Sequence, residues 1–244
     1  MNSKIETEKI VSFIHGVLKK TGLKNIVVGW SGGIDSTVCL YLLAKAIPKE
    51  NIHVLHMPYA HSSINELEII QENIHEISIK KAVDEIWGAI GDIGGIREIR
   101  QKVRLGNIMA RVRMIMLFDF AKKVNGLVCG TENKSEHLLG YFTRYGDEAS
   151  DLEPIQHLFK TQVFELAKYL GVPDSIIKKT PSANLWEGQT DEEEFGFTYK
   201  EADEVLSEVR EYKGMIGGDK GKIREIIMER VKRNKFKQEV PYTI

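Results

Sequence analysis

The sequence predicts an α/β fold: a doubly wound parallel sheet with flanking helices. Short β-branched runs alternate along the chain with longer helical patterns, which is typical of right-handed parallel crossovers. The first run, residues 26–28, contains only isoleucine and valine, as expected for a strand covered on both faces. A pair of glycines then leads directly into an apolar helix. A length of 244 residues suits one large α/β domain, and we expect a single domain over residues 1–244.

The first half of the chain alternates between helical and extended patterns. Ile10, Ile14 and Leu18 lie at helical spacing among charged residues, so the chain is expected to begin with a helix. Pro48 ends the helical pattern that begins at Asp35. The expected elements are helices over residues 1–20, 35–46 and 62–76, and strands over residues 26–28, 52–58 and 78–86.

The second half begins with a long amphipathic helix, which Gly126 should end. The stripe of this helix expected to be buried consists of Ile108, Val112, Ile115 and Met116. Residues 182–197 follow neither period and are expected to form an exposed, mobile loop. Thr198, with Glu201 three residues later, is typical of a helix cap. The other expected elements are helices over residues 105–124, 160–170 and 219–233, and a strand over residues 127–131.

Charge and hydropathy narrow the class of protein. The chain carries 34 basic and 35 acidic side chains, interspersed, so neither a surface for nucleic acid nor a polybasic membrane anchor is expected. It has no apolar signal region and no membrane-spanning apolar run, so we expect a cytoplasmic protein that acts on small molecules. Cys39 and Cys129 lie in apolar runs without metal-ligand spacing and are expected to be reduced core thiols.

The segment SGGIDS, residues 31–36, is the strongest candidate site. Gly32 and Gly33 allow a sharp turn and a close approach of a ligand to the backbone. The helix that follows would present its first N–H groups to an anion, and two serine hydroxyls can add donors. Asp35 would repel phosphate unless a divalent cation lay between them. The loop therefore predicts a nucleotide that is bound with magnesium.

Known phosphate-binding loops help to classify this one. It lacks the lysine of a GxxxxGK[ST] loop, and the GxGxxG pattern is absent as well. SGGIDS instead resembles the pyrophosphate loop of the ATP pyrophosphatases, which cleave ATP to AMP and pyrophosphate. The resemblance implies that ATP is cleaved at its α-phosphate.

A second polar segment, residues 130–154, follows the strand expected at residues 127–131. If a helix begins near Asn133, Glu136 lies in its first turns and faces the same rim of the sheet as Asp35. Two carboxylates from separate loops suit magnesium, which takes few carboxylates together with water and substrate oxygens. The alternative, a Glu136 that is only a solvated helix residue, stays open at this point.

Several basic or polar side chains are weaker candidates for phosphate contacts. Arg104, Asn107 and Arg111 share one face of the long helix, which is either a solvated face or a phosphate-binding one. Lys160 begins a helix, where a cation opposes the helix dipole unless an anion compensates, so it is a candidate phosphate contact. Ser182 would add a hydroxyl to the same site or simply occupy a turn.

The order of further motifs closely resembles one family, the ammonia-dependent NAD synthetases. The chain contains, in one order, GWSGGIDS, GNIMARVRM, GTENKSEHLLGYFTRYGD, LFKTQVFELAKYLGVP and PSANLWEGQTDE. The resemblance runs from about residue 5 to residue 241. It implies an adenine nucleotide alpha hydrolase-like fold. It also implies the last step of NAD biosynthesis, in which ammonia amidates deamido-NAD (nicotinic acid adenine dinucleotide) while ATP is cleaved to AMP and pyrophosphate.

The resemblance also implies the residues of the site. The implied ATP contacts are Gly29, Trp30, Ser31, Gly32, Gly33, Ile34, Asp35, Ser36, Thr131, Lys160 and Ser182. The implied contacts of deamido-NAD are Arg111, Arg144, Asp151, Phe236 and Lys237. Mg²⁺ would be held by Asp35 and Glu136, and catalysis would depend on Asp35, Lys160 and Asp151. Asp151 would orient ammonia or accept its proton. Phe236 stands where the family commonly has histidine, so a stacking surface is kept but a hydrogen-bond donor is lost.

The implied chemistry accounts for these parts. The nicotinate carboxylate would attack the α-phosphate of ATP, pyrophosphate would leave, and ammonia would then displace AMP from the acyl adenylate. Such catalysis depends on positioning and charge neutralisation rather than on a nucleophilic side chain. Family members are homodimers whose substrate site uses both subunits, and the same is expected here. Glutamine-dependent relatives carry an amidohydrolase domain for which this chain has no room, so free ammonia is the expected donor, with a separate glutaminase subunit as the alternative source.

Two alternatives stay open on the sequence. The loop could belong to another pyrophosphatase-loop enzyme, such as a tRNA-modifying or GMP-forming one, although the neutral charge balance and the lack of a CxxC motif argue against tRNA. The protein could also be a regulatory module that senses adenylates without turnover. A sensor, however, needs no second polar segment like residues 130–154.

Overall fold

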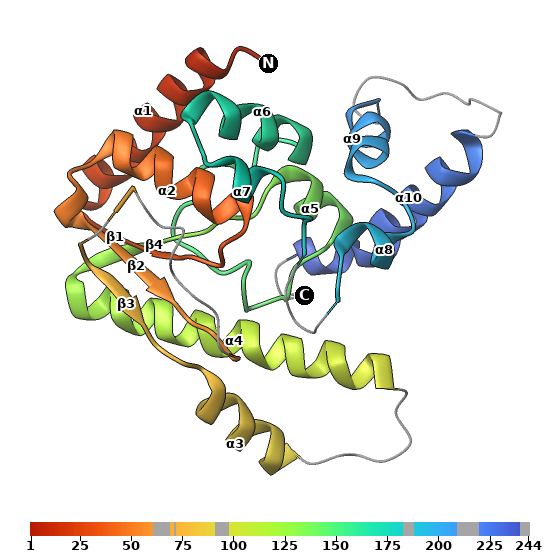
Figure 1. Ribbon diagram of the computed structural model, residues 1–244, viewed down its shortest axis with the longest axis horizontal. Coiled ribbons are helices and arrows are strands. Elements are labelled where there is room, and N and C mark those ends of the chain that lie inside the picture. Colours follow the sequence, from red (N-terminus) through yellow and green to blue (C-terminus); the bar gives the residue numbers. More distant parts are fainter. Residues whose placement is uncertain (61–68, 71, 91–97, 183–187, 209–219, 240–244) are drawn as a thin grey trace, which may run out of the picture.

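The computed structural model describes residues 1–60, 69–70, 72–90, 98–182, 188–208 and 220–239. Their strands form a parallel sheet in the order β3-β2-β1-β4 (Figure 1), which confirms the predicted α/β fold. The strands are Asn25–Gly29 (β1), Ile52–His56 (β2), Ile74–Glu76 (β3) and Gly126–Cys129 (β4).

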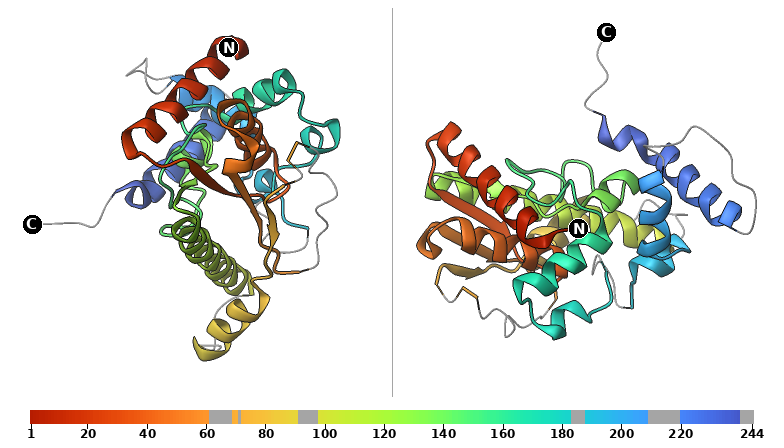
Figure 2. Two further views of the ribbon diagram at one scale, coloured as in Figure 1. Left: turned by 90° about the vertical axis from the view of Figure 1, so that its left-hand side faces the viewer. Right: turned by 90° about the horizontal axis from the view of Figure 1, so that it is seen from above.

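Helices cover both faces of this sheet (Figures 1 and 2). The α-helices are Ser3–Thr21 (α1), Ile34–Ala46 (α2), Lys80–Ile90 (α3), Glu98–Val124 (α4), Lys134–Leu139 (α5), Lys160–Leu170 (α6), Asp174–Ile177 (α7), Asp191–Phe195 (α8), Tyr199–Glu208 (α9) and Lys220–Asn234 (α10). Two short 3₁₀ helices are Lys49–Asn51 (η1) and Lys235–Gln238 (η2). None of the helices in the described ranges has both the length and the hydropathy that a membrane span requires.

The side chains of β1 alternate between two apolar cores. Ile26 and Val28 point to one face, where they pack with α1, α2 and α6. Val27 points to the other face, where it packs with residues of α3 and α4. Both faces of β1 are therefore buried, which explains why residues 26–28 are all apolar and do not alternate with polar residues.

The strand order reverses between β1 and β4. The chain runs outward from β1 to β2 and β3 and then returns to place β4 on the other side of β1, so that Val28 pairs with both Val54 and Cys129. In open α/β sheets ligands bind beyond the carboxyl ends of the strands at such a reversal. The glycine segment after β1 and the polar segment after β4 both begin at this place.

Two predicted elements in the first half are wrong. Residues 78–86 do not form a strand, because α3 begins within them, and the third strand is β3, inside the segment expected to be a helix. Ile79 and Val83 are fully buried and four residues apart, so their spacing fits a helical stripe as well as a strand. Most of the predicted helix over residues 62–76 lies outside the described residues.

The long helix also departs from its prediction. It begins at Glu98 rather than near residue 105, and its buried stripe is centred on Met109 and Val112. Ile115 was expected to be buried but is 58% exposed, because it lies beyond the edge of that stripe. Gly126 belongs to β4, and Asn125, with φ at 52°, forms the turn before it.

The segment expected to be an exposed loop is partly folded. Residues 183–187 lie outside the described residues, but α8 forms directly after them. Phe195 and Phe197 are buried, with ring centroids 5.3 Å apart, in a third apolar core that includes residues of α9 and α10. These helices gather at the end of the molecule away from β3 (Figures 1 and 2). Aromatic pairing thus orders a segment that has no periodicity of its own.

Candidate functional site

The loop after β1 is closed by its own hydroxyl groups. Gly32 has φ at 73°, a left-handed conformation that favours glycine. The Ser36 hydroxyl donates to the carbonyl of Gly33 at 3.2 Å and lies 3.1 Å from the Ser31 hydroxyl. The N–H of Gly33 in turn donates to Ser31 Oγ at 3.3 Å. The two predicted donor serines therefore lie together at the start of α2.

Two side chains of the predicted ATP loop face the core. Trp30 and Ile34 are buried, and the Trp30 indole N–H donates to Thr37 Oγ1 at 3.2 Å. A Cβ at Gly29 would meet the side chain of Leu117 at 3.5 Å. A ligand at these positions would therefore contact the backbone, while the side chains form the wall behind it.

Asp35 and Glu136 converge on one buried cation. Lys160 Nζ lies 2.6 Å from Asp35 Oδ2 and 2.9 Å from Glu136 Oε1, and the lysine side chain is 3% exposed. Asn133 Nδ2 donates to Asp35 Oδ1 at 2.9 Å. The three charged side chains come from the first turns of α2, α5 and α6, which meet beyond the carboxyl ends of β1 and β4.

Local capping holds Glu136 in place. Asn133 caps α5, where its side chain accepts from the N–H of Glu136 at 3.0 Å and its own N–H donates to Glu136 Oε2 at 3.4 Å. This reciprocal pair is a capping box, which the sequence pattern N-x-x-E encodes. The helix start near Asn133 and the position of Glu136 in its first turn are as predicted.

The position of Lys160 depends on α9. The backbone N–H of Lys160 donates to Ser135 Oγ at 2.9 Å, and the Ser135 hydroxyl donates to the carboxylate of Asp203. Asp203 also accepts from the N–H of Thr161 at 2.8 Å. The carboxylate of α9 therefore lies at the N-terminus of α6, where it stabilises the helix dipole that Lys160 opposes.

Burial and the neighbouring charges shift the pKa values of the charged side chains in this cluster. Burial raises the pKa of Glu136 to about 8, Lys160 opposes this rise, and nearby Asp35 adds to it. Burial alone would lower the pKa of Lys160, but Asp35 and Glu136 hold it above its ordinary value. The two acidic neighbours therefore favour the protonated form of Lys160, which supplies the positive charge of the cluster.

Asp191, from the segment expected to be a loop, and Tyr199, at the start of α9, add two further polar groups. The Tyr199 hydroxyl donates to Asp191 Oδ2 at 2.9 Å and lies 3.5 Å from Glu136 Oε1. Tyr141 donates to Asp191 Oδ1 at 3.0 Å. The Tyr199 ring also lies beside Lys160 Nζ, 4.9 Å from the ring centroid. Sequence reasoning missed Asp191, because α8 is short and no helical period marks it, and it missed Tyr199, which begins the helix expected after Thr198 but was not considered a site residue.

The oxygen donors of this cluster suit Mg²⁺. Asp35 and Glu136 already direct one oxygen each at the same cation, the ammonium group of Lys160. Among the described residues no three His, Cys, Asp or Glu side chains form a metal-binding group. Mg²⁺ takes one or two carboxylates and completes its octahedron with water and phosphate oxygens, so Asp35 and Glu136 are the side chains that could hold it.

Three of the residues implied for deamido-NAD lie together around residues 140–144. Arg111 Nε donates to the carbonyl of Arg144 at 3.3 Å. The Arg144 guanidinium donates to the carbonyl of Glu239, and the Lys237 ammonium donates to the carbonyls of Gly140 and Phe142. Phe236, next to Lys237 in η2, is exposed.

The remaining candidates lie at the edge of this area. Asp151 Oδ2 accepts from the N–H of Val128 at 2.8 Å, so its carboxylate lies beside β4. Thr131 follows β4 and is half-buried, as is Ser182. Of the predicted basic stripe, Arg111 faces residues 140–144, whereas Arg104 packs on Trp87 at 5.1 Å.

Comparison with known proteins identifies the family. A family model described as NAD synthase matches residues 6–241. The chain belongs to the NAD synthase family. The NH(3)-dependent NAD(+) synthetase of Fusobacterium nucleatum subsp. nucleatum is 40% identical over 247 residues, which are 99% of this chain and 95% of that protein. The enzyme of the same name from Thermoplasma acidophilum is 41% identical over 239 residues, which are 98% of this chain and 97% of that protein.

Solved structures of the NAD synthase family share the fold. The chain resembles the structure of NMN synthetase from Francisella tularensis with a TM-score of 0.86 and 34% identity, covering 100% of this chain and 99% of that one. It resembles the NH3-dependent NAD synthetase from Campylobacter jejuni with a TM-score of 0.79 and 31% identity, covering 100% of both chains. The fold and the family inferred from the sequence motifs are thus confirmed.

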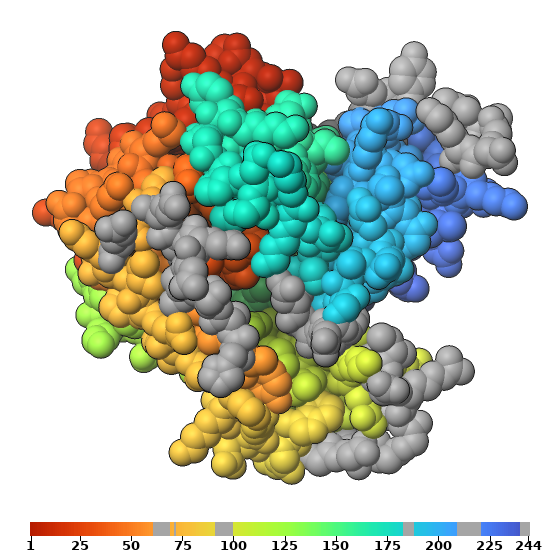
Figure 3. All heavy atoms as spheres, viewed as in Figure 1, coloured from red at the N-terminus to blue at the C-terminus, as the bar shows by residue number. Residues whose placement is uncertain are grey.

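This member of the NAD synthase family has one further cation at its glycine loop. Lys179 Nζ donates to the carbonyl of Gly32 at 3.3 Å. Figure 3 shows the segment of α6 and α7, which Lys179 follows, lying between α2 and the α8–α9 segment. Sequence reasoning missed this residue. The signal was its place two residues before the PSANLWEGQTDE motif and three before Ser182.

Proposed function

We propose that this protein is an ammonia-dependent NAD synthetase, which amidates deamido-NAD with ammonia and cleaves ATP to AMP and pyrophosphate. One observation carries the proposal. A buried lysine and two carboxylates, Lys160, Asp35 and Glu136, meet at the reversal of strand order, beside a glycine loop suited to phosphate. The similarity to ammonia-dependent NAD synthetases over nearly the whole chain supports this reading.

The first step would join the nicotinate carboxylate to the α-phosphate of ATP and release pyrophosphate. Asp35 and Glu136 would hold Mg²⁺, which when bound neutralises phosphate charge and favours departure of pyrophosphate. Asn133 orients the Asp35 carboxylate for this role. Lys160, permanently protonated, would donate to phosphate oxygens, and Gly32 and its neighbours would let the phosphates approach the backbone.

The second step would displace AMP by ammonia. Arg111, Arg144 and Lys237 place positive charge around residues 140–144, where the phosphates of deamido-NAD would bind. Asp151, at the edge of β4, would orient ammonia or accept its proton. No covalent bond to the protein is needed, because the acyl adenylate itself is the activated species.

We also propose that the protein works as a homodimer. The long helix α4 carries Arg111, and four residues further along it Ile115 is 58% exposed, an apolar side chain that a second subunit would cover. Light scattering after gel filtration should give twice the mass of one chain, and Ile115→Asp should lower it. A wild-type monomer would refute this part of the proposal.

The main proposal is tested by incubating the purified protein with ATP, Mg²⁺, ammonium and deamido-NAD. NAD and AMP should form in equal amounts and only when all four are present. If neither product rises above the background of a heat-denatured sample, the proposal fails.

One observation favours a second acceptor. The similarity to the NMN synthetase structure, with a TM-score of 0.86, exceeds that to the Campylobacter NAD synthetase, with 0.79. A chain with that product would accept the mononucleotide acid, which lacks the adenylyl half of deamido-NAD. The ratio of kcat/KM for the two acids, measured in the same assay, decides between them.

A further inference from the structure

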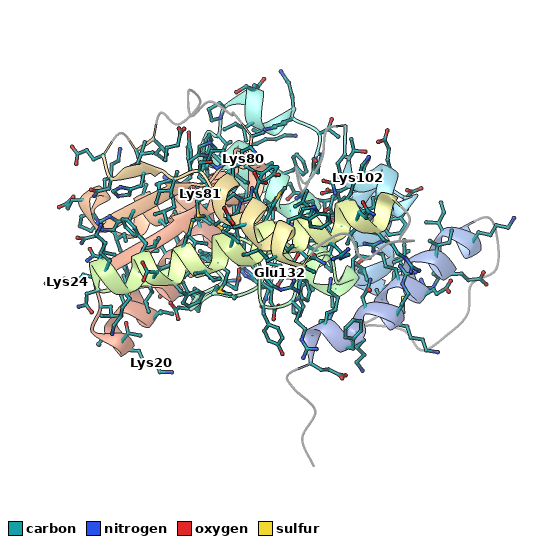
Figure 4. All side chains as sticks on the ribbon, turned by 90° about the horizontal axis from the view of Figure 1, so that it is seen from below. Lys20, Lys24, Lys80, Lys81, Lys102 and Glu132 are labelled. Atoms are coloured by element: carbon teal, nitrogen blue, oxygen red, sulfur yellow. The ribbon has the colours of Figure 1, made fainter. Side chains whose placement is uncertain are left out.

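Two buried glutamates beside the site have no part in the proposed ATP chemistry. Glu132 follows Thr131, and its side chain is 4% exposed. In Figure 4 the labelled Glu132 lies within the fold, whereas the labelled Lys20 lies at its edge. Glu153 lies two residues after Asp151, and its carboxylate accepts from the Glu132 backbone. The two carboxylates are therefore neighbours at the end of β4.

The fold makes room for Glu153. A Cβ at Gly130 would lie only 1.8 Å from Glu153 Oε1, so the carboxylate occupies the space that any other residue would fill. Ser150 Oγ donates to the same oxygen at 2.8 Å. Close packing against Gly130 and the hydrogen bond from Ser150 therefore fix the Glu153 carboxylate in one position at the end of the strand.

One oxygen of each carboxylate is buried without a donor. Among the described residues Glu132 Oε1 and Glu153 Oε2 have no hydrogen-bond partner. The second oxygen of Glu132 has two hydrogen-bond partners: Gln156 Nε2 donates to it at 2.8 Å, and His137 Nδ1 lies 2.9 Å away. A buried carboxylate oxygen without a donor is costly, so a hydrogen-bond donor is missing at this place.

The His137 ring faces only the second oxygen of Glu132, and without a further cation the repulsion between the two carboxyl groups is relieved by a proton on Glu153. Burial, together with the nearby charges of Glu132 and Glu136, raises the pKa of the Glu153 carboxyl to about 8. Lys237, a basic side chain whose charge interacts with Glu132, already donates to the carbonyls of Gly140 and Phe142. A small cation that carries N–H groups would satisfy both free oxygens and relieve their repulsion.

We propose that Glu132 and Glu153 together bind the ammonium ion that supplies the nitrogen of the reaction. The inference rests on the proposed function, which consumes ammonia. Ammonium offers four N–H donors and one positive charge, and it would lie at the end of β4 between Thr131 and Asp151. Transfer of one proton from ammonium to the Glu153 carboxylate leaves ammonia, with its lone pair free to attack, and a neutral carboxylic acid.

The kinetic test separates ammonium binding from ATP chemistry. Glu153→Gln and Glu132→Gln should each raise the KM for ammonium about tenfold or more, the effect of losing a charge-assisted hydrogen bond. The KM for ATP should stay within about twofold. Deamido-NAD-dependent exchange of labelled pyrophosphate into ATP, which needs no ammonium, should persist. Glu165→Gln, an exposed glutamate on α6, is the matched control and should change nothing.

A binding test does not depend on turnover or on the variants' activity. Ammonium chloride, compared with sodium chloride at equal ionic strength, should raise the Tm of the wild type but not that of Glu153→Gln. Unchanged ammonium KM in both variants, or no ammonium-specific rise in the wild-type Tm, overturns the inference, since the pair then holds only a shared proton. Failure of the proposed function is distinct, because the wild type would lack pyrophosphate exchange altogether.

Discussion

Lys160 and Asp35 are 125 residues apart in the sequence, yet Nζ of the lysine lies 2.6 Å from Oδ2 of the aspartate. Lys160 begins α6 and Asp35 lies in the first turn of α2, and these two helices pack on the same face of the sheet. The apolar core between the helices therefore sets the distance between the charges. The packing of α6 against α2 thus places the Lys160 ammonium group beside the glycine loop.

Replacing Lys160 by methionine should damage both stability and activity. The change keeps most of the side-chain volume but leaves Asp35 and Glu136 facing each other without a cation, and breaking a buried ion pair costs about 3–5 kcal/mol. Urea unfolding followed by circular dichroism measures the loss of stability, and NAD formation at saturating substrates should fall about 100-fold or more.

Lys178→Met provides the control for that change. Lys178 also lies 2.6 Å from a carboxylate, that of Asp174, but both side chains are about three-quarters exposed, at 75% and 76%. Solvent screens such a pair, so neither the unfolding curve nor the turnover should change. A Lys160→Met protein as stable and as active as this control would contradict the role of the buried cluster.

Lys179 should contribute to ATP binding. Its ammonium lies at the carbonyl of Gly32, within reach of phosphates bound at the loop, and its side chain is not part of the core. Lys179→Met should therefore raise the KM for ATP about tenfold with little change in the KM for deamido-NAD. Initial rates at varied ATP measure the effect, with Lys178→Met as the neighbouring control. An unchanged KM for ATP removes this assignment.

The local geometry that agrees with the sequence analysis is encoded in short segments. SGGIDS follows a buried strand directly, and the capping box of Asn133 and Glu136 spans three residues, so both can be recognised in a short window. The partners of Lys160 come from α2 and α5, and its cap, Asp203, from α9. The local sequence therefore marked Lys160 only as a cation at an unfavourable helix end and a candidate phosphate contact, and its role in catalysis was implied by the family resemblance alone.

The parts that were missed depend on packing between distant segments. Ile79 and Val83 fit a helical stripe and an apolar strand equally well, and only their contacts with α4 decide for α3. Phe195 packs with Phe197 and Tyr199 close by in the sequence, but the core that buries it also needs α10, which begins only at Lys220. Asp191 and Tyr199 reach the site because that core forms.

The stability of the protein should depend on Glu153 in a defined pH window. Its pKa rises from an ordinary 4.5 to about 8 on folding, chiefly through burial. Below pH 4.5 both states hold the proton. Between 4.5 and 8 only the folded state holds it, so stability falls as pH rises, by up to about 1.4 kcal/mol per pH unit.

Glu153→Gln should remove this pH dependence. Unfolding free energies of the wild type and the variant, measured in sodium salts without ammonium, should converge or cross as the pH rises from 4.5 to about 8. Parallel curves would show that Glu153 titrates alike in the folded and unfolded states.

Gly140 and Gly171 offer a matched test of how α10 docks beside the site. Both end a helix with positive φ, 63° and 78°, so alanine at either should cost about 1 kcal/mol of backbone strain. A Cβ at Gly140 would also lie 2.4 Å from Cβ of Asn234 in α10, whereas a Cβ at Gly171 would meet nothing within 4 Å. Gly140→Ala should therefore lower the free energy of unfolding clearly more than Gly171→Ala does.

Because Asn234 immediately precedes η2, which holds Lys237, Gly140→Ala should also raise the KM for deamido-NAD. Equal effects of the two substitutions on stability would mean that α10 does not rest on this glycine.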